Sequence, residues 1–407
     1  KVKNQMELQR NKIQLYANQV FVTEDVEGIV PEYLTLLHGV IDSPDIPLNV
    51  SRSYLQSDAQ VKKISNHISK KVADRLDELF RNERSLFEEK WESLKVFVQY
   101  GMLSDEKFYD RAVKFDLVTD IDGKHFTLDE YRTLTEGEQT EKEGQLVWLY
   151  TNDRNSQYTA IERAKAKGYS VLLLDGPLDV HAVSQLEQKL EKTRFVRVDS
   201  DSIDKLIAKD EQRAVSLSDV EQKALKALFE GRLPREEKRN YSVSLEALGA
   251  DADAVLITQG EFMRRMQEMA RLQPGMNFYG ELPEGYNVVL NTEHPLIQRL
   301  LASEKEVVEP KLSTLRAELQ EQSELVEAAR TVQSAKKPEE VSVAEREELD
   351  ALTSKQAELE GKISEEIKKF GSEELLVGQL VDLALLGNGL LSGEALAAFI
   401  RRSQQLL

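Results

Sequence analysis

The sequence predicts a multidomain protein with α/β and α+β parts. The chain has 407 residues, more than twice the roughly 150 residues of a typical domain. Hydrophobic residues make up 41% of it, close to the value for globular proteins, so each domain can bury a core. From residue 144 onward, continuous apolar runs alternate with amphipathic stretches, a pattern typical of a small parallel sheet covered by helices.

We divide the chain into three domains. Residues 1–115 form the first, with α/β layers, and residues 116–208 form the second, which joins connecting helices to the small parallel α/β subdomain. Residues 209–407 form an α+β domain that begins at a polar junction (209–220) and contains a highly charged insertion (304–374). Each domain is long enough to bury its own core.

The first domain begins with strands. KIQLYANQVFV (12–22) alternates apolar and polar residues and predicts two strand segments. VPEYLTLLHGVID (30–42) has apolar residues at helical spacing and predicts a helix. Pro44 and Pro47 exclude a helix after it, because each lacks a backbone N–H and holds the residue before it extended.

Two long helices follow in the same domain. Ser57 or Asp58 can cap the first, whose apolar residues between Val61 and Phe80 recur every three or four positions. LFEEKWESLKVFVQYGM (86–102) predicts the second.

The second domain contains the parallel sheet. Its strands are predicted at QLVWLY (145–150), YSVLLLD (169–175) and RFVRVD (194–199), with an amphipathic helix between successive strands. The turns after the first two strands, TNDRNSQ and DGPLD, lack the glycine fingerprint that brings backbone close to a pyrophosphate. We therefore expect no dinucleotide site here.

In the third domain, a helix (220–231) precedes two predicted strands, YSVSLEAL (241–248) and AVLIT (254–258). Within the charged insertion, 30 of 71 residues are charged. Two heptad-like apolar seams, one ending at Val326 and one at Phe370, lie on either side of the break SAKKPEEVS. The pattern predicts a projecting antiparallel helical hairpin, and a disordered acidic linker is the alternative.

The last segment, residues 375–407, predicts two short helices separated by a Gly-Asn-Gly turn. Asp382 and this turn interrupt the apolar run, which is therefore not a membrane span. The first helix is apolar nearly all round, so it must be buried on every side. Two arrangements satisfy this requirement: packing inside the domain, or a four-helix bundle with a second copy of the chain.

Composition and motifs argue against several kinds of function. The net charge of −18 argues against nucleic acid and anionic membranes as partners, because binding phosphate needs clustered Lys and Arg. The absence of cysteine removes disulfides and thiolate metal sites, and it fits a reducing compartment. The five histidines lack metal-ligand spacing, and no phosphate loop, serine elbow or paired-carboxylate motif stands out. The residues alone therefore indicate neither a metal site nor an enzyme.

Two features could carry function. A helical stripe of methionine and phenylalanine either lies in the core or offers an adaptable surface to apolar partners. The stripe consists of Phe262, Met263, Met266 and Met269. Arg52 follows a proline-rich run and precedes a predicted helix, whose backbone N–H groups attract anions. It either forms a salt bridge with Asp42 or Asp45, or completes an anion site.

Six stretches of the chain carry a family resemblance. The longest is HGVIDSPDIPLNVSRSYLQ (38–56). The others are KIQLYANQVFV (12–22), ISKKVADRLDELF (68–80), GYSVLLLDGPLDVHAVSQL (168–186), TEHPLIQRLL (292–301) and FIRRSQQLL (399–407). Together they closely resemble the heat-shock protein 90 family of molecular chaperones in its bacterial form, and the longest resembles the signature of the family's middle domain. The insertion 304–374 departs from the family pattern, which implies no function for it.

The resemblance implies an ATP-binding N-terminal domain, a middle domain and a C-terminal dimerisation domain. We expect this chain to be a middle plus C-terminal piece of such a cytoplasmic chaperone, which by itself binds and hydrolyses no ATP. In the family, the arginine at the position of Arg52 reaches the γ-phosphate of magnesium-bound ATP when the N-terminal domain docks. Gln56 assists it, and Asn49 and Ser51 shape the loop.

The resemblance also implies two protein-binding surfaces. The methionine stripe would hold partly folded client proteins, and the terminal helices would form a homodimer. The residues expected in the dimer interface are Leu380, Leu383, Leu386, Leu390, Leu396, Phe399 and Ile400. The alternative function is a structural scaffold that recruits a partner through the projecting hairpin.

Overall fold

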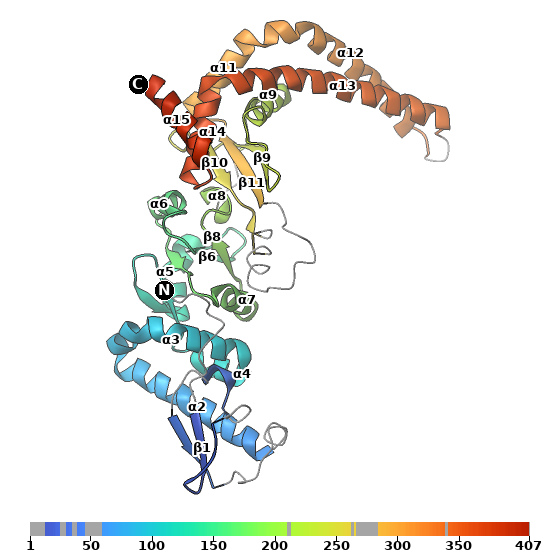
Figure 1. Ribbon diagram of the computed structural model, residues 1–407. Coiled ribbons are helices and arrows are strands. Elements are labelled where there is room, and N and C mark those ends of the chain that lie inside the picture. The colour runs from blue at the N-terminus through green and yellow to red at the C-terminus, as the bar shows by residue number, and fades with distance from the viewer. Residues whose placement is uncertain are drawn as a thin grey trace. The chain divides into compact units, whose positions relative to one another are not determined.

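The computed structural model describes residues 13–24, 30–34, 39–44, 59–209, 213–261, 264–265, 284–337 and 341–406. Within these ranges the chain is a mixed α/β protein with several small sheets and many helices, as the sequence predicts (Figure 1). It divides into two compact units. Unit 1 holds residues 1–154 and 161–198, and unit 2 holds residues 155–160 and 199–407. The division into three domains stays a prediction.

A three-stranded sheet opens unit 1. Strand β1 (Ile13–Ala17) lies in its centre, antiparallel to β2 (Val20–Thr23) and parallel to β3 (Gly39–Asp42). Because side chains alternate along a strand, β1 sends its first, third and fifth residues into the core. The two strand segments predicted over residues 12–22 are confirmed.

The predicted helix over residues 30–42 is wrong. Of its described part, only Glu32–Leu34 is helical, as the 3₁₀ turn η1, and the last four residues form β3. Val40 and Ile41 are β-branched and pair with β1. Pairing with a distant strand outweighs the helical spacing, which is only a local signal.

Three helices follow in unit 1, and they confirm the two long helices of the sequence analysis. They are α2 (Ala59–Asn82), α3 (Arg84–Ser104) and α4 (Glu106–Ala112). Large aromatic side chains are fully buried in the core that these helices share: Phe87, Trp91, Phe108 and Phe115. Burying side chains of this size is a main source of stability for the unit.

The rest of unit 1 contains a parallel sheet. It is preceded by β4 (Leu117–Thr119), β5 (His125–Thr127) and α5 (Leu128–Gln139). Its strands are β6 (Leu146–Thr151), β7 (Val171–Leu173) and β8 (Thr193–Arg197), joined by α6 (Tyr158–Ala166) and α7 (Asp179–Lys189). The central strand β6 is parallel to both neighbours, and all six of its residues are buried, as expected for a sheet covered on both faces.

A second mixed sheet lies in unit 2. After α8 (Ile203–Leu206) and α9 (Asp219–Glu230) come β9 (Arg239–Glu246), β10 (Val255–Thr258) and β11 (Glu284–Asn291). β11 is central, antiparallel to β10 and parallel to β9. β11 is absent from the strands that the sequence predicts, because its short apolar run is equally compatible with part of a helix.

The charged insertion forms a helical hairpin, and the alternative of a disordered linker is wrong. After α11 (Pro295–Val307), the helices α12 (Glu309–Ser334) and α13 (Val343–Glu373) run side by side (Figure 1). Apolar residues from both helices are buried between them: Leu312, Val326, Leu359 and Ile363. No described helix of the chain combines the length and apolarity needed to span a membrane.

Two glycines bring α13 directly against α9. A Cβ atom added to Gly371 would lie 2.1 Å from the carbonyl oxygen of Leu228. One added to Gly231 would lie 2.2 Å from the carbonyl oxygen of Lys368. Both distances are far below the ~3.3 Å at which carbon and oxygen normally touch. The helix backbones are therefore in contact here, and this contact fixes the base of the hairpin.

Candidate functional site

The predicted nucleotide-contact residues Arg52, Gln56, Asn49 and Ser51 lie outside the described residues, as does Asp45. Asp42, the other predicted partner of Arg52, is described at the end of β3. Its carboxylate accepts the backbone N–H of Gln19 at 3.1 and 3.2 Å. Asn18 and Gln19 have φ angles of 49° and 65°, a left-handed turn that such an acceptor stabilises. Asp42 thus has a structural role in the turn between β1 and β2.

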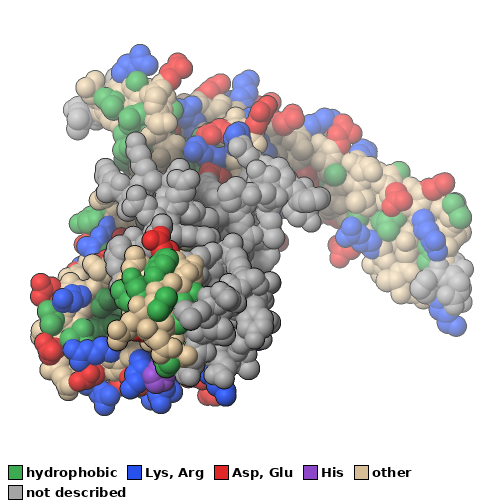
Figure 2. Space-filling view, turned by 60° about the horizontal axis from the view of Figure 1, so that its bottom comes forward, with side chains coloured by type: hydrophobic (Ala, Val, Ile, Leu, Met, Phe, Trp, Pro, Cys, Tyr) green, Lys and Arg blue, Asp and Glu red, His purple; other side chains and the backbone are tan. Residues whose placement is uncertain are grey.

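Exposed apolar side chains also lie on the same sheet. Val20, Phe21 and Val40 are each at least half exposed. Figure 2 shows hydrophobic side chains gathered on the forward part of unit 1, with Lys and Arg side chains along its lower margin. Val20 and Phe21 are consecutive on β2 and therefore point to opposite faces of the sheet, so they do not form one continuous patch with Val40.

The predicted client-binding residues Phe262, Met263, Met266 and Met269 also lie outside the described residues. Two arginines within this stretch are described. Arg264 and Arg265 each donate to Glu261 at 2.6 Å. Burial opposes ionisation of Glu261, but the two guanidinium groups outweigh it and hold the pKa of this carboxyl below its usual value. The start of the methionine stretch therefore carries a fixed charge cluster.

The last two helices, α14 (Leu375–Gly387) and α15 (Gly393–Leu406), form a pair held by one arginine. Arg402 on α15 forms an ion pair with Asp382 on α14 and donates to the Gln379 side-chain oxygen at 3.1 Å. Both charged side chains are mostly buried, at 11% and 15% exposure. This polar contact fixes α15 against one side of α14.

The predicted dimer-interface residues fall into three groups. Leu380 and Phe399 are buried in the core of unit 2, and Leu390 and Leu396 are half-buried against it. Leu383, Leu386 and Ile400 remain 48%, 40% and 47% exposed. Packing inside the unit therefore covers one side of α14 and leaves an apolar face open on the pair.

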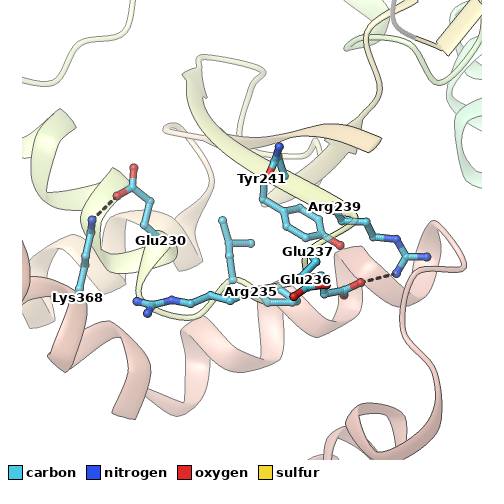
Figure 3. A pocket seen from close by; sticks show the side chains of 10 residues that line it. Glu230, Arg235, Glu236, Glu237, Arg239, Tyr241 and Lys368 are labelled. Carbon is cyan, nitrogen blue, oxygen red and sulfur yellow. Dashed lines mark hydrogen bonds and ion pairs between the residues drawn. The ribbon is translucent and has the colours of Figure 1, made fainter. Parts of the chain in front are cut away.

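A hollow of about 570 Å³ lies at the base of the hairpin, between α9, β9 and α13. Figure 3 shows Lys368 reaching Glu230 and Arg239 reaching Glu236, at 2.8 and 3.2 Å. The ring of Tyr241 also lines the hollow and stacks on Tyr286. The charged side chains that line the hollow largely neutralise one another. Among the described residues, no cluster of His, Asp and Glu could hold a metal ion. The hollow therefore gives no support to a catalytic role.

A buried charge cluster in unit 1 escaped the sequence analysis. The Asp179 carboxylate, at the start of α7, accepts hydrogen bonds from Lys95 at 2.9 Å and from Gln99 at 2.7 Å, both on α3. Asp116 is buried nearby, and burial raises its pKa to about 7, an effect that Lys95 opposes and Asp179 reinforces. Lys95 and Asp179 are 84 positions apart, so no local pattern could reveal their contact.

Comparison with known proteins identifies the family. A family model described as Hsp90 protein matches residues 1–371, which is most of the chain. The chain belongs to the Hsp90 family. The match to the Hsp90 model ends near the end of α13, so the pair of α14 and α15 lies beyond it.

Several curated relatives of the Hsp90 family extend over the whole chain. The chaperone protein HtpG of Porphyromonas gingivalis W83 is 63% identical over 407 residues, which is all of this chain and 60% of the relative. The HtpG protein of Bacteroides fragilis 638R is 52% identical over the same length. The HtpG protein of Bdellovibrio bacteriovorus is 27% identical over 305 residues, or 72% of this chain. The chain thus spans about 60% of the length of its most similar Hsp90 relatives.

Proposed function

We propose that this chain is the client-binding and dimerising part of an ATP-dependent Hsp90 chaperone of the bacterial cytoplasm. The observation that carries the proposal is the open apolar face of the α14 and α15 pair, formed by Leu383, Leu386 and Ile400. Family membership supports it, because it implies partly folded client proteins and association into dimers.

A second copy of the chain is the partner that fits this face. A two-fold axis brings the same pair of helices from each copy together as a four-helix bundle. Burying each of the three exposed side chains contributes about 1 kcal/mol. The half-buried Leu390 and Leu396 add further apolar area.

Substituting glutamate for leucine on this face tests whether the chain dimerises through it. The double variant Leu383→Glu/Leu386→Glu should shift the chain toward monomer in sedimentation velocity, because it would bury four carboxylates in the bundle. Leu134 in unit 1 is 54% exposed, and Leu134→Glu is the matched control that should remain dimeric. A double variant that sediments like the wild type would place the interface elsewhere.

For the nucleotide reaction, we propose that Arg52 and Gln56 act on ATP held by another domain. A guanidinium presents a planar fork of N–H donors, which suits the oxygens of a γ-phosphate. Charge builds up on these oxygens during phosphoryl transfer, so Arg52 stabilises the transition state when the two domains close. Asn49 and Ser51 hold the loop that presents it.

The test uses a chain that also carries the nucleotide-binding domain of the family. Arg52→Ala should lower the kcat of ATP hydrolysis by about 10³-fold, while the Kd for ATP stays nearly unchanged. Arg75, an exposed arginine paired with Glu78, supplies the control variant Arg75→Ala. A large loss of ATP affinity in Arg52→Ala would mean that Arg52 contacts the ground state instead.

Client binding is assigned to the methionine stripe. Thioether side chains are flexible and polarizable, so they repack around different apolar segments. Met266→Asp/Met269→Asp should lose the ability to suppress heat aggregation of citrate synthase. Val332→Asp, at an exposed apolar position of the hairpin, should retain it. If the wild type and both variants suppress aggregation equally, the methionine stripe does not bind client proteins.

A scaffold function is the second candidate, because the far part of the hairpin exposes Leu325, Val332 and Val343. Under this alternative, shortening the hairpin between residues 318 and 362 abolishes capture of a specific partner. The chaperone proposal expects such a shortened chain to keep both dimerisation and aggregation suppression.

A further inference from the structure

The surface of α2 departs from the acidic character of the chain. The net charge is −18, yet residues 59–72 contain four lysines and no acidic residue. The lysines are Lys62, Lys63, Lys70 and Lys71, and all are exposed. Lys63, Asn66 and Lys70 follow one another at spacings of three and four, so they share one face of the helix.

Helix α4 and the turn after it provide further cations. Lys107 and Arg111 are four residues apart on α4 and share one face, and Lys114 follows two residues after the end of the helix. These three cations line a hollow of about 490 Å³ together with Lys70 and Asn66 of α2. Sites for small molecules have volumes of roughly 300–1,000 Å³, so the hollow is large enough for a ligand.

The carboxylates of the hollow do not neutralise its cations. Asp105 accepts three hydrogen bonds, from the backbone N–H groups of Lys107 and Phe108 and from the Ser69 hydroxyl, at 2.9, 3.2 and 3.0 Å. It is therefore fully engaged as the cap of α4. Asp110 is the other carboxylate of the lining, and Asp74 outside the lining pairs with Arg111, so three acidic groups lie beside four cations.

The lysines of the hollow are available to a ligand. Lys70, Lys107 and Lys114 form no ion pair with any residue in the part of the chain that the structure describes. Arg111 is oriented by Asp74, which binds one of its terminal nitrogens at 3.2 Å. The other terminal nitrogen has no partner among the described residues.

We propose that the hollow between α2 and α4 binds a compact polyvalent anion of the oligophosphate class. Lysine binds a phosphate group as a mobile point charge, and a guanidinium adds a planar fork that also matches phosphate oxygens. The lining has three lysines and one arginine. From Lys107 to Arg111 the cations on α4 span about 6 Å, since each helical residue rises ~1.5 Å, and Lys114 extends this row in the turn after the helix. Several linked phosphates can lie along such a row.

The net negative charge of the chain favours a compact anion over a long polyanion as the ligand. A long polyanion such as nucleic acid, or an anionic membrane, extends beyond the hollow and meets the net negative surface. Salt screens charges beyond about 10 Å, so a small anion responds chiefly to the local lysines. A free oligophosphate therefore gains the attraction of the hollow without the repulsion of the remaining surface.

Calorimetric titration of the chain with sodium tripolyphosphate, at constant ionic strength, tests the proposal. We expect one site per chain. Lys70→Gln/Lys107→Gln should weaken binding about tenfold or more, because it removes two of four cations from the hollow. Lys114→Gln, in the turn after α4, should weaken binding as well. Lys90→Gln/Lys124→Gln removes two exposed lysines from elsewhere in unit 1 and should leave the affinity nearly unchanged.

Three results would overturn the proposal. The first is the absence of binding heat, and the second is an equal loss of affinity in both double variants, which would reveal a general charge effect. The third is tighter binding of a hexaglutamate peptide than of tripolyphosphate, which would assign the hollow to acidic peptides. Thermal unfolding of each variant, followed by circular dichroism, distinguishes loss of the binding site from loss of the fold. We expect each variant to have the melting temperature of the wild type, because the substituted lysines are exposed.

Discussion

Replacing Gly371 with alanine tests how closely α13 and α9 approach. The added Cβ would lie 2.1, 2.8 and 2.9 Å from the carbonyl oxygen, carbonyl carbon and Cα of Leu228. These are backbone atoms in the last turn of α9, so they cannot move unless the end of the helix moves. Restoring the ~3.3 Å of an ordinary contact requires the helices to separate by about 1 Å. The separation would loosen the base of the hairpin.

The expected cost follows from two opposing effects. Overpacking of a well-packed contact costs roughly 1–3 kcal/mol, and the better helix propensity of alanine offsets at most about 1 kcal/mol of it. We therefore expect Gly371→Ala to lower the free energy of unfolding of unit 2 by about 1–2 kcal/mol. Gly361 lies in the same helix, and a Cβ there would meet nothing within 4 Å. Gly361→Ala should therefore stabilise the unit by up to about 1 kcal/mol.

Urea unfolding followed by two signals measures the effect. Both tryptophans, Trp91 and Trp148, lie in unit 1, so their fluorescence reports that unit alone, whereas far-ultraviolet circular dichroism reports both. Gly371→Ala should lower the midpoint of the dichroism transition and leave the fluorescence transition in place. If Gly371→Ala and Gly361→Ala unfold at the same urea concentration, the backbones are not in contact and the reasoning fails.

Three further changes have defined outcomes. Burial raises the pKa of Asp116 to about 7 from its usual 3.8. The protonated carboxyl therefore makes its full contribution to the stability of the fold below pH 3.8, and this contribution is lost as the pH rises through 7. Asp116→Asn should therefore gain on the wild type in the urea midpoint of tryptophan fluorescence as the pH rises from about 4 to about 7. A difference that does not change with pH would contradict this. Arg402→Met leaves the Asp382 charge unpaired and should lower the free energy of unfolding by roughly 3 kcal/mol, as measured by circular dichroism, and adding Asp382→Leu should recover most of this loss. No recovery would mean that the loss does not come from the unpaired Asp382 charge. Ser342→Ala removes the capping box of α13 and should cost about 1 kcal/mol in the same assay, whereas the exposed Ser354→Ala should be neutral.

Local signals in the sequence were enough to predict several elements correctly. The seams of the charged insertion predict the hairpin, because apolar residues repeating every three or four positions must face a partner helix. The apolar run and the Gly-Asn-Gly turn predict α14 and α15 for a similar reason, and Gly389 in the turn has a φ angle of 68°. The proposed dimer face is harder to assign, since the sequence shows which residues are apolar but not that Leu380 and Phe399 are covered within one copy.

Elements that depend on distant pairing could not be predicted in this way. β3 was assigned to a helix because its pairing with β1 leaves no local pattern, and β11 was missed although it lies in the centre of its sheet. The contact of Gly371 with Leu228 joins two helices far apart in the chain. The buried cluster around Asp179 likewise depends on a contact between residues far apart in the chain, so no local pattern predicts it. Arg52 and the methionine stripe were found only from motif and family resemblance, and their roles stay predictions.

The molar mass of the chain in solution tests the central claim most directly. Sedimentation equilibrium at micromolar concentration should give twice the 46.3 kDa of a single chain, because the open face of Leu383, Leu386 and Ile400 is covered by a second copy. A mass of 46.3 kDa that does not change with concentration would contradict the claim that this chain is the dimerising part of a chaperone.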